Sequence, residues 1–329
     1  MLGRALVGRD PRGVFPCHQR TAVRLLLVPI AGRAGHERRY DGTMIEPASC
    51  FFESQGLRLH YADWGNEAAP PLILIHGGLD HCRNWDAVAR QLQPHFHIVA
   101  PDLRGHGDSD WARGSSYGLS ENVYDLVRLV RSAGLPDAAL VGHSLGGMIA
   151  LAYAGTYPER VSRLTILDGA FLSRSQAAPI NEQMSRWIDQ LDRISQQEPG
   201  NFATIEEAAQ RLMSRNKRLT PELALHLASH GVRQNAGGGY RWKFDHYQRA
   251  RAPYRLSPAD YAALWSRIAC PTLLMWGDES FIPDPGAAGL LAHFQKAELK
   301  KIAGAGHWLH HDRLDDVLAA MRPFLGMPR

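Results

Sequence analysis

The sequence predicts an α/β fold: a mostly parallel, eight-stranded sheet flanked by helices, with a helical segment inserted into it. Strand and helix patterns alternate from residue 49 to residue 170. The central apolar runs, such as "LILIHGG" at 72–78, are continuous rather than alternating, as is typical of strands that helices cover on both faces. The alternation stops over 171–265 and then resumes, which indicates an insertion.

The first six strands are expected from short apolar segments with helical patterns between them. The segments at 49–54 and 57–65 flank Gln55-Gly56, a pair that favours a tight hairpin. The next strands are expected at 72–78, 97–102, 138–143 and 164–168, and the helices between them at 85–93, 121–134 and 146–158. Such βαβ alternation implies parallel strands, whose carboxyl ends lie at one edge of the sheet, where ligands bind.

Residues 171–265 contain several helix starts in a row and are expected to form a helical lid. Thr204 and Glu207 match a capping box, Thr220 precedes a proline, and Ser257 precedes another. The core then comprises residues 44–170 and 266–329. It resumes with strands at 271–277 and 297–304 and with helices at 287–295 and 313–325.

The first 43 residues differ from the rest in composition. They contain eight arginines, no lysine and three acidic residues, a net charge of +5 within a chain of net charge +4. The remaining residues therefore carry −1, which argues against nucleic-acid binding. An arginine-rich, acid-poor leader is also typical of an organellar transit peptide. We nevertheless expect residues 1–43 to be a disordered extension, or the product of a start codon placed too early, with the fold beginning at Met44.

Composition limits the class of protein further. Hydrophobic residues make up 45% and charged residues 21% of the chain, as in soluble globular proteins, and no apolar run is long enough for a membrane span. The four cysteines, Cys17, Cys50, Cys82 and Cys270, show neither metal-ligand nor redox spacing. We therefore expect a cytoplasmic protein with reduced thiols, no metal and no cofactor. The sequence does not indicate an oligomeric state.

The most specific motif is "GHSLGG" at 142–147. Its first five residues form G-x-S-x-G, placed after a predicted strand and before a predicted helix, which is the context that this motif requires. The chain must turn sharply at the serine, and the flanking glycines let neighbouring elements approach. Ser144 is therefore the candidate nucleophile, and the amide of Leu145, in the first turn of the helix, is a candidate oxyanion donor.

A second oxyanion donor is expected from "HGG" at 76–78, which ends an earlier strand. The amide of Gly78 is the candidate, because the fold supplies this donor from the loop after such a strand. We expect His76 to fix the loop by hydrogen bonds rather than to act in catalysis.

The general base is expected late in the chain, where "GAGHWLHHD" offers three histidines. His307 follows a strand in a glycine-rich turn that brings its ring to the carboxyl edge of the sheet. His310 and His311 begin the next helix, where packing or capping roles are expected. His307 is therefore the candidate that takes the proton of Ser144 and passes it to the leaving group.

Together the motifs resemble the α/β-hydrolase fold family, of the type with a helical lid, over residues 49–325. The motifs are "HGG" at 76, "PDLRGHGDS" at 101, "GHSLGG" at 142, "LDG" at 167, "WGDES" at 276 and "GAGHW" at 304. The resemblance implies a Ser–His–Asp triad and no cofactor. Epoxide hydrolases and haloalkane dehalogenases of this fold carry an aspartate nucleophile, so Ser144 separates this chain from them, because a serine forms an acyl-enzyme.

The acid of the triad has two candidates in this sequence. In most members of the family it stands three residues after the glycine that closes the seventh strand, where this chain has Ser280. Some members supply it instead from the end of the sixth strand, where this chain has Asp168. We therefore expect Asp168 to be the acid, with Asp278 as the alternative. Glu279 is expected to face away, and Asp284 to be a turn residue.

Two further motifs are expected to have structural roles. In "PDLRGHGDS", Arg104 is expected to pair with a carboxylate and His106 to hold the loop. In "GGGYRWKFD" at 237–245, the aromatic residues Tyr240, Trp242 and Phe244 alternate at strand spacing. We expect them to anchor the lid and in part to line an apolar pocket, rather than to stack on nucleic acid.

The expected function is that of a serine hydrolase that cleaves a small, mostly apolar carboxylic ester or a related acyl compound. Two alternatives remain. Relatives use the same triad to hydrolyse a carbon–carbon bond in a ring-cleavage diketone, and other proteins of this fold are small-molecule receptors. In each case the expected partner is a small molecule.

Overall fold

The sheet at the centre of the protein runs in the order β1-β2-β3-β5-β4-β6-β7-β11-β12 in the part of the chain that the computed structural model describes. The structure describes residues 46–112, 114, 116–171, 179–197, 200–250 and 256–327, together with the backbone of 14–15. The eight expected strands are all present: β2 (Ala48–Ser54), β3 (Leu57–Asp63), β4 (Pro71–Ile75), β5 (His97–Pro101), β6 (Ala138–His143), β7 (Val161–Leu167), β11 (Thr272–Gly277) and β12 (Ala297–Ile302).

One strand comes from the N-terminal segment. β1 (Val14–Phe15) pairs antiparallel with β2, opposite Phe52 and Phe51, and makes the sheet nine-stranded. The rest of the expected extension, residues 1–13 and 16–43, lies outside the described residues. Among the described residues, no helix is both long and apolar enough to cross a membrane.

The cysteines differ from the expectation at one position. Cys82 and Cys270 are free and buried, but Cys50 on β2 is disulfide-bonded. The expectation of reduced thiols is therefore wrong for Cys50, because sequence spacing does not show which thiols the fold brings together.

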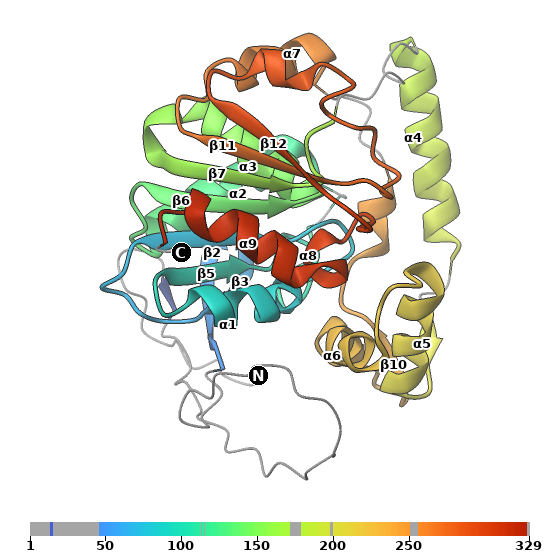
Figure 1. Ribbon diagram of the computed structural model, residues 1–329. Helices are drawn as coiled ribbons and strands as arrows, with labels where there is room; N and C mark the ends of the chain where they lie inside the picture. Colours follow the sequence, from blue (N-terminus) through green and yellow to red (C-terminus); the bar gives the residue numbers. More distant parts are fainter. Residues whose placement is uncertain are drawn as a thin grey trace.

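Helices cover both faces of the sheet (Figure 1). One apolar cluster joins the sheet to α2 (Leu119–Ser132), α3 (Leu145–Thr156) and α7 (Pro258–Trp265). The other joins it to α1 (Asp86–Leu92), α8 (Leu309–Asp312) and α9 (Leu314–Phe324). In the main sheet, the strands from β5 to β12 in the order given above are parallel neighbours. The continuous apolar sequences of central strands such as β4 and β6 follow from burial on both faces.

The inserted segment contains both helices and strands. Its helices are α4 (Ile180–Ser195), α5 (Ile205–Arg215) and α6 (Pro221–Gly231), and its strands are β8 (Asn201–Phe202), β9 (Val232–Gln234) and β10 (Tyr240–Trp242). The strands form a small antiparallel sheet in the order β8-β10-β9. Figure 1 shows this segment beside the main sheet. The expected helix starts at Thr204 and Thr220 are present, and each side chain accepts from a backbone amide.

The end of the expected lid segment packs on the core. α7 begins at the helix start expected at Ser257, which forms a capping box with Asp260. Its last residue, Trp265, is fully buried in the same cluster as α3. The helix expected at 287–295 is instead a short 3-10 helix, η6 (Leu290–His293), because Gly289 has a positive φ of 72° that ends a regular helix. The other described 3-10 helices are η1 (Cys82–Trp85), η3 (Pro158–Arg160) and η5 (His246–Arg249).

Candidate active site

Ser144 occupies the sharp turn between β6 and α3. Its backbone has φ 50° and ψ −115°, a conformation that non-glycine residues rarely adopt. The two flanking glycines are required by close approach: a β-carbon at Gly146 would lie 2.2 Å from the Ile75 carbonyl oxygen, and one at Gly142 would lie 2.4 Å from the Gly146 carbonyl oxygen. The strained turn leaves the partly exposed Ser144 side chain at the N-terminus of α3.

His307 lies beside this serine, in the loop after β12. Its Nε2 is 3.0 Å from Ser144 Oγ, and its Nδ1 is 2.5 Å from Asp168 Oδ2. An ionised carboxylate only accepts hydrogen bonds, so Nδ1 carries the proton and Nε2 is free to accept from the serine hydroxyl. This tautomer is the one that a general base next to a nucleophile requires.

Asp168 follows β7 directly, and β7 lies next to β6, the strand that ends before Ser144. Asp168 also has a positive φ, 48°, and its amide donates to the Met275 carbonyl oxygen at 2.8 Å. The residue is 3% exposed. The structure therefore brings the expected acid, base and nucleophile together at the carboxyl ends of neighbouring parallel strands.

Ser280 fills the position where the family places the acid. Its hydroxyl donates to Asp168 Oδ2 at 2.5 Å and accepts from the Ile282 amide at 3.0 Å. The alternative acid, Asp278, is exposed and instead accepts from the Gly304 amide at 2.8 Å. It makes no contact with His307 among the described hydrogen bonds and ion pairs.

The other acidic residues of this loop have partners elsewhere. Asp284 accepts from the amides of Gly286 and Ala287 and pairs with Lys301, so it is the expected turn residue. Glu279 pairs with Arg218 of the inserted segment. Neither faces the histidine.

The two expected oxyanion donors lie near each other at the head of α3. A β-carbon added at Gly78 would be 3.8 Å from Leu145 Cδ2. Neither the Gly78 amide nor the Leu145 amide donates to a protein acceptor in the described part of the chain. Next to Gly78, Leu79 has φ 63°, and its amide donates to His106 Nε2 at 3.0 Å, which fixes the loop.

The remaining histidines near the site hold loops in place. His76 Nδ1 donates to the Gly77 carbonyl oxygen, and His76 Nε2 accepts from the Leu103 amide. His106 Nδ1 donates to the Arg104 carbonyl oxygen. Burial lowers the pKa of His76 to about 4 and that of His106 to about 3. Both are therefore neutral near pH 7, and their structural roles agree with the expectation.

Arg104 makes the expected pair with a carboxylate. Its Nε donates to Asp125 Oδ2 at 2.6 Å and its Nη2 donates to Asp125 Oδ1 at 2.7 Å. Because Asp125 lies on α2, this buried pair ties the "PDLRGHGDS" loop to the helix layer beneath it.

Three contacts at the site were not expected from the sequence. His143, which precedes the nucleophile, donates from Nε2 to the His307 carbonyl oxygen at 2.8 Å. Burial, with the neighbouring His307, lowers the pKa of His143 well below its usual value, so it remains a neutral donor. Phe281 is 73% exposed and its ring lies 4.5 Å from that of His307. The third is the hydrogen bond from Ser280 to Asp168.

A cavity of about 270 Å³ lies between the core loops and the inserted segment. Gly78 lines it from the core, together with Trp308, the neighbour of His307. Trp242 and Phe244 line it from the inserted segment, and their rings stack 5.8 Å apart. Most of the wall is apolar; the polar lining residues are Asp80, His81, Arg215, Asn216, Lys243 and His311.

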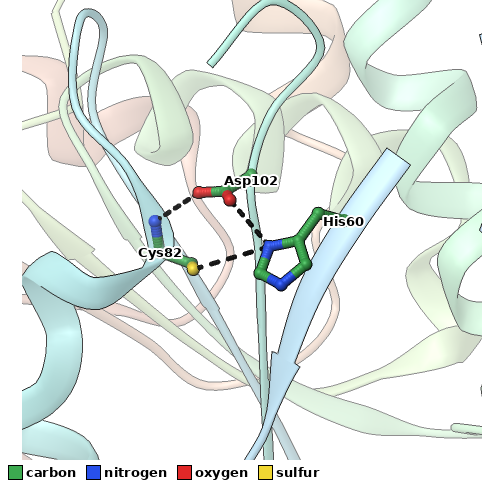
Figure 2. A group of neighbouring side chains, drawn as sticks. All are labelled: His60, Cys82 and Asp102. Atoms are coloured by element: carbon green, nitrogen blue, oxygen red, sulfur yellow. Dashed lines mark hydrogen bonds and ion pairs between the residues drawn. The ribbon is translucent and has the colours of Figure 1, made fainter. Parts of the chain in front are cut away.

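A second buried group, His60, Cys82 and Asp102, lies outside this site (Figure 2). His60 Nδ1 and the Cys82 amide both donate to Asp102 at 2.7 Å, and Cys82 Sγ lies 3.9 Å from the same Nδ1. A histidine that relays a proton uses one nitrogen for the acid and the other for the nucleophile, so this arrangement does not activate the thiol. Burial also raises the pKa of Cys82.

The other ring nitrogen of His60 is 3.0 Å from Ser49 Oγ, which gives a Ser–His–Asp order. Ser49 lies within β2, however, where no helix N-terminus supplies oxyanion donors. Asp102 also accepts from the Asp108 amide at 2.9 Å, so its carboxylate has three donors without a metal. The group therefore holds the loop after β5.

One further cluster has metal-ligand spacing among the described residues: Asp86, His226 and His230. Arg83 donates to Asp86 from both Nε and Nη2, at 2.7–3.0 Å. A metal ion would have to displace this guanidinium, so the cluster fits an ion pair better than a metal site.

Comparisons with known proteins agree with this fold. A family model described as alpha/beta hydrolase fold matches residues 70–314. The chain is 25% identical to mouse epoxide hydrolase 3 over 285 residues, covering 83% of this chain and 75% of that protein. It is 26% identical to the esterase YbfF of Escherichia coli strain K12 over 262 residues, covering 78% of this chain and 92% of the esterase. Among solved structures, a thioesterase domain from the curacin biosynthetic pathway is similar, with a TM-score of 0.74, 28% identity, and coverage of 83% of this chain and 98% of that domain.

Proposed function

Because the chain belongs to the α/β hydrolase fold family, we propose that it hydrolyses small, mostly apolar carboxylic esters or related acyl compounds through a serine acyl-enzyme. The observation that carries the proposal is the hydrogen-bonded chain Ser144–His307–Asp168, with distances of 3.0 and 2.5 Å. A serine in this arrangement is activated for attack on a carbonyl carbon.

In the first half of the reaction, Ser144 Oγ attacks the ester carbonyl while His307 Nε2 takes the hydroxyl proton. Asp168 holds the ring in the required tautomer and stabilises the imidazolium. The carbonyl oxygen becomes an oxyanion, which the amides of Gly78 and Leu145 stabilise. His307 then gives its proton to the leaving alcohol as the carbon–oxygen bond breaks.

In the second half, water replaces the alcohol. His307 Nε2 takes a proton from the water as it attacks the acyl carbon, and returns it to Ser144 Oγ as the acyl-enzyme bond breaks. The products are a carboxylic acid and the free enzyme. Every step is carried by side chains and amides of this chain, so the proposal requires no cofactor.

The cavity supports a substrate that is small and mostly apolar. A volume of about 270 Å³ lies just below the range of roughly 300–1,000 Å³ that is usual for ligand pockets. Its aromatic walls, Trp242, Phe244 and Trp308, suit an alkyl or ring group. The nucleophile also distinguishes this chain from the aspartate-dependent enzymes of the fold, since a serine ester is formed with an acyl group rather than with the alkyl carbon of an epoxide.

The test is a panel of nitrophenyl esters of increasing acyl length, assayed with the wild type and with Ser144→Ala. We expect hydrolysis that depends on Ser144 and that declines for acyl chains too long for the cavity. The absence of Ser144-dependent hydrolysis across the whole panel would contradict an esterase.

The same site admits two alternatives, which the assays separate. A carbon–carbon hydrolase would cleave a ring-cleavage diketone much faster than any ester of the panel. A receptor would bind its ligand tightly and turn over slowly, and Ser144→Ala would leave the affinity unchanged.

A further inference from the structure

Arg218 joins the inserted segment to the two loops that position the proposed triad. It lies between α5 and α6, and its Nη2 pairs with Glu279 in the loop after β11. Its Nε lies 3.7 Å from Asp312 Oδ2, on α8. One guanidinium thus contacts two carboxylates that come from different parts of the core.

Each of these carboxylates lies one short step from a residue of the site. Glu279 immediately precedes Ser280, which donates to Asp168. Asp312 Oδ2 accepts from the Gly306 amide at 2.8 Å, and Gly306 immediately precedes His307. A β-carbon at Gly306 would lie 3.2 Å from both Arg218 Nη1 and Asp312 Oδ2, so the loop packs directly against this pair.

We infer that Arg218 is a positioning residue: by bridging Glu279 and Asp312 it couples the docked state of the inserted segment to the orientation of His307 and Asp168. The inference rests on the proposed function, since it concerns the same three side chains. The inference adds that His307 and Asp168 are fully aligned only when the inserted segment is docked on the core through Arg218.

The charges around Asp312 show why an arginine is needed there. The carboxylate is almost completely buried, with 2% of the side chain exposed. Burial raises the pKa of Asp312; the Gly306 amide, the Arg218 charge and the Asn216 side chain act against this, and the Glu279 charge adds to it. Without Arg218 the carboxyl group would take up a proton at higher pH, and its hydrogen bond to the Gly306 amide would weaken.

The contact between Arg218 and Glu279 is partly exposed to solvent. Arg218 is 39% exposed and Glu279 is 56% exposed, so the pair between them is partly solvated. Such pairs contribute little to global stability. Loss of the Glu279 pair is therefore expected to cost little stability. Loss of the Asp312 contact leaves a buried carboxylate without its arginine, so the melting temperature of each variant is measured beside kcat.

The experiment compares Arg218→Gln, Arg218→Lys and wild type. For Arg218→Gln we expect kcat to fall about ten- to a hundredfold, with KM changed much less, because misplaced catalytic groups cost rate rather than binding. The acidic limb of kcat should also move to higher pH. Arg218→Lys keeps the charge and should restore part of kcat and most of the pH profile.

The matched control is Arg186→Gln on α4. Arg186 pairs with Glu182 at 2.8 Å on the surface of the same segment and contacts neither loop, so its substitution should leave kcat at the wild-type value. In a double-mutant cycle, Arg218→Gln added to Asp312→Asn should cost much less than it does alone.

A readout independent of turnover separates this inference from the proposed function. The Nδ1 proton of His307, in its short bond to Asp168, should give a far-downfield NMR signal in the wild type and in Arg186→Gln, and a weaker or shifted one in Arg218→Gln. An unchanged signal with unchanged kcat, or a loss confined to KM, would overturn the inference. Ester hydrolysis that persists in Ser144→Ala would instead overturn the proposed function. The NMR comparison of Arg218→Gln with the wild type would still test the positioning of His307.

Discussion

Ser280 Oγ donates a hydrogen bond to Asp168 Oδ2 at 2.5 Å, so the residue at the position that most of the family use for the acid contacts the carboxylate that we propose as the acid here. Asp168 Oδ2 accepts from both Ser280 and His307. Asp168 follows β7, which lies in the sheet between β6, the strand before Ser144, and β11, the strand before the loop of Ser280. The Ser280 hydroxyl therefore helps to fix the rotamer of Asp168.

The first prediction separates the two candidate acids. Asp168→Asn should lower kcat by roughly 10⁴-fold, because the amide favours the wrong tautomer of His307 and does not stabilise the imidazolium. Asp278→Asn should have little effect, since its side chain only accepts from the Gly304 amide. Steady-state kinetics with the best ester of the panel checks both variants, and a crippling effect of Asp278→Asn alone would show that the assignment is wrong.

The second prediction concerns Ser280. Ser280→Ala should lower kcat modestly, by about tenfold or less, because Asp168 loses one neutral hydrogen bond but keeps His307. In the Asp168→Asn background, Ser280→Asp should recover part of the lost kcat, since it returns a carboxylate to the position that most relatives use. No recovery, in a protein with a wild-type melting temperature, would show that the loop after β11 is too far from His307 for this exchange.

The sequence predicts the sheet well because its strands are buried on both faces. Apolar runs such as Leu72–Ile75 and Leu273–Met275 are buried along their whole length, and a short continuous apolar run of this kind is typical of a strand that helices cover on both faces. The nucleophile turn is equally predictable, because the approach of 2.2 Å at Gly146 excludes any side chain there.

Other features depend on contacts between distant residues and are invisible to local pattern. In the small sheet, Tyr240 of β10 lies opposite both Phe202 and Gln234. The strand spacing of the aromatic residues indicates β10, but its partners β8 and β9 are too short to be recognised alone. The role of Ser280 likewise depends on the order of β7 and β11 in the sheet. The sequence shows that residue 280 is a serine, but it does not show that the partner of this serine is Asp168.

The third prediction addresses the cavity. Trp242→Ala should enlarge it and shift the preference toward longer acyl chains, changing the ratio of kcat/KM for long and short esters by about tenfold. The side chain lines the cavity and stacks on Phe244, so its removal opens space within the cavity. Tyr124→Ala, at an aromatic residue 43% exposed on α2, is the control. An equal change of kcat/KM for all chain lengths would show that Trp242 does not contact the acyl group.

The last prediction follows from the buried histidines and concerns stability at low pH. Burial lowers the pKa of His76 to about 4 and that of His106 to about 3, against 6.5 in the unfolded chain. Above pH 6.5 both states are neutral and these residues add no pH dependence. As the pH falls below 6.5, the unfolded chain binds protons that the folded chain does not, so the free energy of unfolding decreases, by up to about 1.4 kcal/mol per pH unit for each histidine.

Urea unfolding between pH 7 and pH 4 measures this slope. His106→Gln keeps a donor and an acceptor for the Arg104 carbonyl oxygen and the Leu79 amide but does not titrate. His106→Gln should therefore reduce the slope of the unfolding free energy against pH by the contribution of one histidine, up to about 1.4 kcal/mol per pH unit. It should lower the free energy of unfolding at pH 7 only moderately. The same substitution at the exposed His95 is the control. A wild-type slope in His106→Gln would contradict this. It would mean that His106 binds its proton as readily in the folded protein as in the unfolded chain, so that Nε2 does not accept from the Leu79 amide at low pH.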